Sequence, residues 1–188
     1  MTSANPLHLR AGDAALIVID IQERLIAAMP DKVRPALLRN TAILIAAARA
    51  LGVPIVVSEQ YPKGLGPTVP EIAGTLGDAA PIDKTAFSAL GEPRFKDALE
   101  RTGRRQAIVV GIEAHVCVFQ TVVDLVEAGY GVFVPADAVA SRTKENWKIA
   151  QGLVTGAGAH VTSTEAVAFQ LVERAGTEPF KLVSKLVR

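Results

Sequence analysis

The sequence predicts an α/β fold, a three-layer α/β/α sandwich around a mostly parallel sheet of about six strands. Two observations support this prediction. Short apolar runs rich in Ile and Val recur along the chain, as expected for strands buried on both faces of a parallel sheet. Segments of helical periodicity separate these runs, which favours right-handed crossovers with helices on both faces. Because the 188 residues contain no linker or internal repeat, we expect residues 1–188 to form one domain.

The expected strands and helices follow one another in regular order. Apolar runs predict strands at residues 14–21, 54–58, 81–84, 106–111, 131–134 and 160–163. Apolar residues at helical spacing predict helices at residues 33–50, 94–102, 116–126 and 146–154. A last helix is expected to begin near Thr164, with Ser163 or Thr164 as its cap. Residues 59–77 are rich in Pro and Gly and predict a long ordered loop that could wall a pocket.

The charge balance and the lengths of the apolar runs indicate what kind of partner the protein binds. Lys and Arg total 20 against 19 Asp and Glu, without a run of like charge, so the electrostatic footprint of a nucleic-acid or anionic-membrane binder is missing. No apolar run approaches membrane-spanning length. We therefore expect a small-molecule partner, no nucleic acid and no membrane.

The hydropathy of the chain predicts its oligomeric state, and its single cysteine bears on its cellular compartment. Hydrophobic residues make up 49% of the chain, and its mean hydropathy is +0.29, which favours a homo-oligomer with part of its surface covered. A single cysteine excludes an internal disulfide, and residues 1–10 do not have the pattern of a secretory signal. These features favour a reducing cytoplasm.

Three reactive side chains follow predicted strands on the carboxyl side, where ligands bind in open α/β sheets. Asp20 ends the first strand, Lys84 ends the third, and Cys117 lies where the fourth gives way to a helix. The helix start and the lysine would lower the pKa of the thiol, and the aspartate could receive its proton. Taken singly, such residues are more often a core cysteine, a turn-capping aspartate and a surface lysine.

Three segments carry a resemblance to a known family. They are LIVIDIQERL at residues 16–25, DKTAFSA at residues 83–89 and GIEAHVCVFQTVVDLVEAGYGVFVPADAVASR at residues 111–142. Together they closely resemble the isochorismatase-like cysteine hydrolases. The segment SEQYPKGLGPTVPEI at residues 58–72 is most similar to the small hydrolases described only as isochorismatase domain-containing proteins.

The resemblance implies a site and a reaction. Asp20, Lys84 and Cys117 match the family's catalytic triad, and the family's non-proline cis peptide falls between Ile112 and Glu113. The resemblance further implies an oxyanion hole made by the backbone N–H groups of Glu113 and Cys117. Retention of the cysteine favours hydrolysis of an amide-type C–N bond through a thioester, rather than cleavage of the vinyl ether of isochorismate.

The chain departs from the nicotinamidase branch of the family at its metal ligands. That branch has an Asp-x-His pattern after the second strand, where this chain has Ser58, Glu59, Gln60 and Tyr61. We therefore expect no catalytic metal and no cofactor. The expected walls of the substrate pocket are Gln22, Tyr61, Leu65, Phe87 and Phe119. Whether His115 faces that pocket or solvent stays open.

Two other functions compete with the hydrolase. A metal-dependent phosphoryl-transfer domain also uses residues of the Asp20 and Lys84 types, but the sequence near Asp20 offers no further carboxylate for a magnesium ion. A non-catalytic oligomeric scaffold with a degenerate pocket is the other alternative, and the intact triad argues against it.

Overall fold

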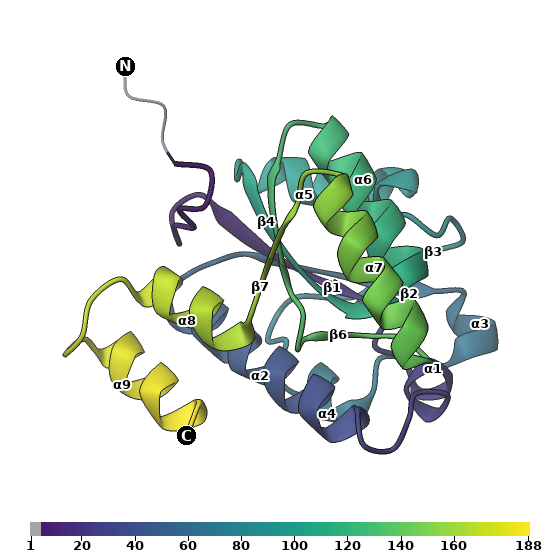
Figure 1. The fold of residues 1–188 in the computed structure, drawn as a ribbon, viewed down its shortest axis with the longest axis horizontal. Helices are drawn as coiled ribbons and strands as arrows, with labels where there is room; N and C mark the ends of the chain where they lie inside the picture. Colours follow the sequence, from purple (N-terminus) through teal and green to yellow (C-terminus); the bar gives the residue numbers. More distant parts are fainter. Residues whose placement is uncertain (1–4) are drawn as a thin grey trace.

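The computed structural model describes residues 5–188 and confirms the three-layer α/β/α fold (Figure 1). Residues 1–4, which belong to the N-terminal stretch tested for a signal, lie outside the described residues. All strand pairs in the sheet are parallel, in the order β3-β2-β1-β4-β5-β7, and β6 pairs beside β4. The strands are β1 (Ala14–Ile19), β2 (Ile55–Gln60), β3 (Ile82–Lys84), β4 (Gln106–Ile112), β5 (Gly131–Pro135), β6 (Val139–Ala140) and β7 (His160–Thr162).

Helices cover both faces of the sheet (Figure 1). Helices α2, α8 and α9 pack on one face, and α5, α6 and α7 lie on the other. The helices are α1 (Glu23–Ala27), α2 (Arg34–Ala50), α3 (Pro62–Leu65), α4 (Pro70–Ala73), α5 (Pro93–Arg101), α6 (Phe119–Glu127), α7 (Lys144–Gly156), α8 (Thr164–Val172) and α9 (Glu178–Leu186). A 3₁₀ turn, η1 (Ala89–Gly91), precedes α5, and a π-helical turn, η2 (Ala114–Val118), precedes α6.

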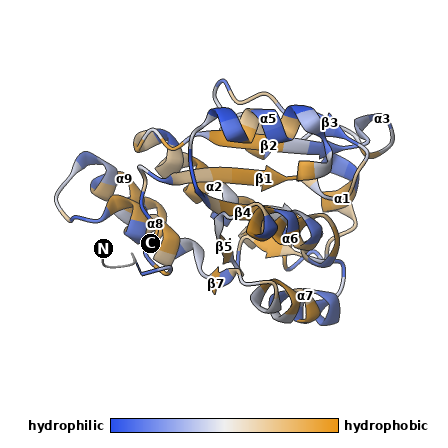
Figure 2. Cartoon of the chain, turned by 90° about the horizontal axis from the view of Figure 1, so that it is seen from above, coloured by the Kyte–Doolittle hydropathy of each residue, from blue (hydrophilic) through white to orange (hydrophobic). Residues whose placement is uncertain are grey.

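The sheet divides the apolar interior into two cores. Alternate residues of β1 enter opposite cores: Leu16 and Val18 pack under α2 and α8, whereas Ile17 and Ile19 face α5 and α6. All four side chains are fully buried, which explains why this strand is apolar along its whole length. Figure 2 shows the same arrangement, with apolar residues on the strands and polar residues along the outside of α5.

The structure differs from the sequence prediction in three segments. The sheet has seven strands within residues 5–188 instead of about six, because the two-residue strand β6 pairs with the end of β4. Residues 59–77 include the end of β2 and the short helices α3 and α4. Beyond α8, whose cap is Ser163, the chain forms the further helix α9, which packs on α2 and α8.

A close backbone approach joins the carboxyl ends of the two central strands. Gly111 of β4 lies opposite Ile19 of β1 and has a φ of 124°. A Cβ atom at this position would overlap the carbonyl of Ile19. Glycine is therefore required at position 111, where the ends of β1 and β4 lie close together at one edge of the sheet.

We predict that Gly111→Ala destabilises the fold by about 2 to 4 kcal/mol, because the methyl group adds both overlap and an unfavourable φ. Gly152→Ala is the matched control, since Gly152 lies in helix α7 with open space around it and should gain up to about 1 kcal/mol. Urea unfolding of the two variants and the parent measures both effects. Equal stabilities for Gly111→Ala and the parent would contradict this reading of the β1–β4 contact.

Candidate active site

The carboxyl ends of β1, β3 and β4 carry the three predicted catalytic residues. Asp20 directly follows β1, Lys84 is the last residue of β3, and Cys117 lies in η2 after β4. Strand order reverses between β1 and β4, and ligands of open α/β sheets bind at such switch points. The topology thus brings residues from three distant segments to one edge of the sheet.

Asp20 is fully buried and held at both carboxylate oxygens. Ser58 donates a hydrogen bond from Oγ to Oδ1 at 2.7 Å, and Lys84 donates from Nζ to Oδ2 at 2.8 Å. Asp20 also has a φ of 51°, a left-handed conformation that is uncommon for a residue other than glycine and often found at functional sites. The carboxylate is therefore fixed in position and charge-compensated inside the protein.

Lys84 is a buried cation rather than a surface lysine. Its side chain has no exposed surface, and Nζ forms an ion pair with Asp20. The same ammonium donates to Gln60 Oε1 at 2.6 Å and to the carbonyl oxygens of Phe87 and Ala86 at 3.0 and 3.2 Å. A buried ammonium needs this degree of compensation to remain charged.

Ser58 and Gln60 are members of this network that sequence reasoning missed. The sequence indicated only that residues 58–61 do not match the metal ligands of the nicotinamidase branch. Ser58 pairs with Ile19 of β1, directly before Asp20, and Gln60 lies two residues further along β2. Because side chains alternate along a strand, both point to the same face. That register was the available signal, given the pairing of β1 with β2.

Cys117 is buried beside this charged pair, and the expected depression of its pKa is wrong. Burial raises the pKa of the Cys117 thiol to about 12, helped by the negative charge of Asp20. Lys84 lowers the pKa of the thiol, but by less than these two effects raise it. Desolvation and a neighbouring carboxylate both disfavour a thiolate, so the resting site holds a neutral thiol next to Asp20.

The corner between β4 and η2 contains the predicted oxyanion-hole residue Glu113. The peptide bond between Ile112 and Glu113 is cis. The Glu113 carboxylate accepts hydrogen bonds from the Arg142 backbone N–H at 3.1 Å and from Arg142 Nε at 3.0 Å. Its carbonyl accepts from Val116 and Val118. Side chain and backbone contacts therefore fix this corner four residues before Cys117.

The predicted pocket residues lie in different surroundings. The Gln22 side chain is buried and hydrogen-bonded to backbone groups of Gln60 and Gly66, so it braces the start of the loop at residues 61–68. Tyr61 and Phe87 are 55% and 53% exposed, and Leu65 and Phe119 are half-buried. Tyr61 and Lys84 border one cavity of about 300 Å³.

His115 is half-buried in η2, two residues before Cys117. Its Nδ1 lies 3.0 Å from the hydroxyl of Ser141. The histidine thus has a polar neighbour within the protein, in the segment that follows β6.

Across residues 5–188, no three or more His, Cys, Asp or Glu side chains are grouped so that they could hold a metal ion. None of the helices in this part of the chain is both long and apolar enough to cross a membrane.

Fold and site together define an α/β protein with a buried charged pair and a cysteine at the switch point of its sheet. A sequence model of the isochorismatase domain matches residues 14–166. The chain belongs to the isochorismatase family and is a hydrolase of that family.

Individual relatives agree with this assignment. The secreted isochorismatase effector Isc1 of Phytophthora sojae is 40% identical over 158 residues, which cover 82% of this chain and 75% of the relative. A Caenorhabditis elegans structure described as MAR1 ribonuclease has a TM-score of 0.88 and 41% identity, covering 96% of this chain and 92% of that one. The YcaC gene product of Escherichia coli, described as an octameric hydrolase of unknown specificity, has a TM-score of 0.90 and 25% identity, covering 98% and 91%.

Because the pKa of the Cys117 thiol is raised, the rate of its alkylation should depend steeply on pH. The rate at which iodoacetamide modifies Cys117 should rise about tenfold per pH unit between about pH 7 and pH 10, without a plateau, because thiolate is the reactive form. Mass spectrometry of the peptide that contains Cys117 follows the reaction, because lysine amines also react with iodoacetamide toward about pH 10 and Cys117 is the one cysteine of the chain. The urea-unfolded protein serves as control and should level off above about pH 8.5. A plateau near neutral pH in the folded protein would show a stabilised thiolate instead.

Proposed function

We propose that the protein is a cysteine-dependent hydrolase that cleaves an amide-type C–N bond of a small molecule through a thioester. The influence of the buried Asp20 carboxylate on the Cys117 thiol, whose pKa it raises, carries this proposal. Asp20 is positioned by two donors and lies where its charge raises the pKa of the thiol. A carboxylate in this position can accept the proton of an attacking thiol.

The first half of the reaction forms the thioester. Asp20 accepts the proton of Cys117 as the sulfur attacks the substrate carbonyl carbon, so that loss of the proton and formation of the C–S bond are coupled. The backbone N–H groups of Glu113 and Cys117 donate to the oxyanion that develops. When the tetrahedral intermediate collapses, the C–N bond breaks, and protonated Asp20 returns its proton to the leaving amine or ammonia.

The second half releases the acid. Water attacks the thioester carbonyl carbon while Asp20 accepts a proton from it. The C–S bond then breaks, and the sulfur recovers a proton from Asp20 to regenerate the thiol. Throughout the cycle, Lys84 and Ser58 hold the carboxylate in place. This sequence uses side chains of the chain and water, and it calls for no cofactor or metal.

The substrate proposed for this site is small and partly apolar. Its proposed contacts are Tyr61, Leu65, Phe87 and Phe119, of which Tyr61 and Phe87 have large exposed surfaces available to a ligand. Gln22, expected as a further wall, is fully buried and hydrogen-bonded to the backbone, so it supports the loop instead of contacting the substrate. Because the cysteine is retained, an amide, carbamoyl compound or ureide fits the chemistry better than the vinyl ether of isochorismate.

The alternative functions fit the geometry less well. A phosphoryl-transfer centre needs carboxylate oxygens free for a metal ion, whereas both oxygens of Asp20 accept hydrogen bonds from Ser58 and Lys84. A non-catalytic scaffold with a degenerate pocket does not need a buried charged network of this kind. Hydrolysis of RNA is a further rival because of the name of the Caenorhabditis elegans neighbour, but the net charge of +1 offers little attraction for a polyanion.

The proposal also covers the oligomeric state of the protein and its location in the cell. We infer a homo-oligomer, supported by the octameric Escherichia coli neighbour and by large apolar side chains left exposed in the single chain, such as Ile149, Leu153 and Val161. A cytoplasmic location is proposed from the lone, buried thiol. The Phytophthora sojae relative is described as secreted, so membership of the family does not by itself indicate a cytoplasmic location.

The two charged partners of the thiol should have opposite effects on its labelling. Asp20→Asn removes the charge that raises the pKa of Cys117, so labelling at about pH 8 should accelerate about tenfold while turnover is lost. Lys84→Met should slow labelling, because the lysine lowers the pKa of the thiol. Asp97→Asn, an exposed carboxylate on α5, is the matched control and should change neither quantity.

Circular dichroism establishes that each variant is folded before its labelling is read. If Lys84→Met fails to fold, the Asp20→Asn result alone decides. Slower labelling in folded Asp20→Asn would remove Asp20 as the neighbour of the thiol.

Cys117→Ala should lower the rate of hydrolysis more than about a thousandfold, because the nucleophile is lost. The assay substrate is first identified by screening the parent protein for turnover of small amides, carbamoyl compounds and ureides, with a short RNA included. Unfolding by urea should show that the variant retains most of its stability, since alanine removes only one buried atom. Hydrolysis that survives in the folded variant would contradict the cysteine mechanism, and cleavage of RNA alone would contradict the substrate class.

A further inference from the structure

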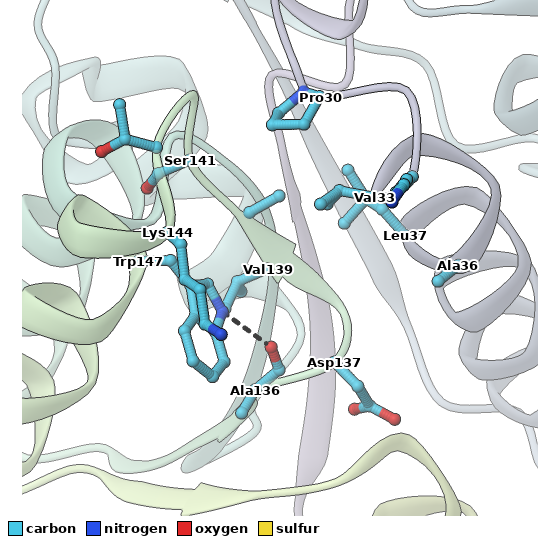
Figure 3. A pocket seen from close by; sticks show the side chains of 13 residues that line it. Pro30, Val33, Ala36, Leu37, Ala136, Asp137, Val139, Ser141, Lys144 and Trp147 are labelled. Carbon is cyan, nitrogen blue, oxygen red and sulfur yellow. Dashed lines mark hydrogen bonds between the residues drawn. The ribbon is translucent and has the colours of Figure 1, made fainter.

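A groove separate from the catalytic residues lies between the start of α2 and the start of α7 (Figure 3). It encloses a cavity of about 490 Å³, within the range of small-molecule sites. One wall comes from residues 30–37, and the other from residues 136–147. Asp20, Lys84 and Cys117 are not among the residues that line it.

The floor and walls of the groove are mainly apolar. Val33 and Leu37 face Val139 and Trp147 across it (Figure 3). The indole N–H of Trp147 donates to the carbonyl of Ala136 at 3.0 Å, which fixes the ring and satisfies its polar atom. The ring itself remains half-exposed and available for contact with an apolar ligand.

The charge around the groove is predominantly positive. Lys32 lies on the α2 side and Lys144 on the α7 side, and both are exposed. Within residues 5–188, neither lysine forms an ion pair. Asp137 also borders the groove, but its Oδ1 accepts two hydrogen bonds from Thr164, and Figure 3 shows its carboxylate pointing away from Trp147.

One end of the groove is polar. The hydroxyl of Ser141 is buried there and contacts His115 Nδ1. A hydroxyl can make more than one hydrogen bond, so Ser141 retains capacity for a ligand oxygen. The groove therefore offers an apolar floor, a hydroxyl at one end and two cations at its rim.

We propose that this groove binds a small carboxylate with an apolar body, at a site distinct from the catalytic one. The apolar part lies against Trp147, Val139 and Leu37, and the carboxylate lies near Lys32 and Lys144. The concave shape favours a small ligand, and the positive rim favours an anionic one over a neutral one. A second copy of the chain is the competing occupant, and the experiment below separates the two.

Trp147 is the one tryptophan of the chain, so its fluorescence reports directly on the groove. The titration uses octanoate and its neutral analogue octanamide in the Cys117→Ala background, where the outcome is independent of catalysis. We expect a saturable change in emission with octanoate, at an affinity about fivefold to tenfold higher than for octanamide, because two exposed ion pairs add modestly.

The double variant Lys32→Met and Lys144→Met should reduce the affinity for octanoate about fivefold to tenfold, to that for octanamide. Lys148→Met is the matched control, since Lys148 is exposed on α7 but does not line the groove, and it should leave the affinity unchanged. Retention of the full affinity in the double variant, or the absence of a saturable response, would overturn the proposal. Emission that follows protein concentration and ignores octanoate would assign the groove to a second copy instead.

Discussion

The buried ion pair between Asp20 and Lys84 is the interaction on which the candidate site depends. Neither side chain has exposed surface, so each charge is stable there only because the other is present. Removing one partner of such a pair costs about 3 to 5 kcal/mol, since the remaining charge is left uncompensated. Ser58 and Gln60 from β2 complete the shell around this pair, which ties the site to the register between β1 and β2.

This charged pair determines how the cysteine can react. A thiolate beside an ionised carboxylate in a buried place is unfavourable, and the pKa of Cys117 is accordingly raised to about 12. In the proposed mechanism, the same carboxylate accepts the proton when it leaves the sulfur. A site of this kind keeps the thiol neutral, and therefore protected from adventitious electrophiles, until an acyl substrate makes proton transfer and attack favourable together.

Much of the fold and the position of the three reactive residues could be predicted from the sequence, because both follow from local patterns. Apolar runs such as residues 14–21 and 106–111 define buried strands, and parallel topology then places the residues after them at one edge. The partners Ser58 and Gln60 could not be predicted, since they depend on strand register and rotamers. The raised pKa of Cys117 depends on burial, which spacing does not reveal. Strand β6 is too short for a periodic signal, and the groove joins segments about a hundred residues apart in sequence.

The protonation state of Cys117 and its contact with Asp20 are read most directly from the infrared S–H stretching band of the single cysteine, recorded at neutral pH in the protein and in Asp20→Asn. We expect the band in both proteins, because the thiol is neutral. It should lie at lower frequency in the parent, where the S–H group donates to a carboxylate, than in the variant. Absence of the band in the parent at neutral pH would mean a resting thiolate. An unshifted band in Asp20→Asn would mean that the thiol does not contact Asp20, and either result would contradict the proposed mechanism.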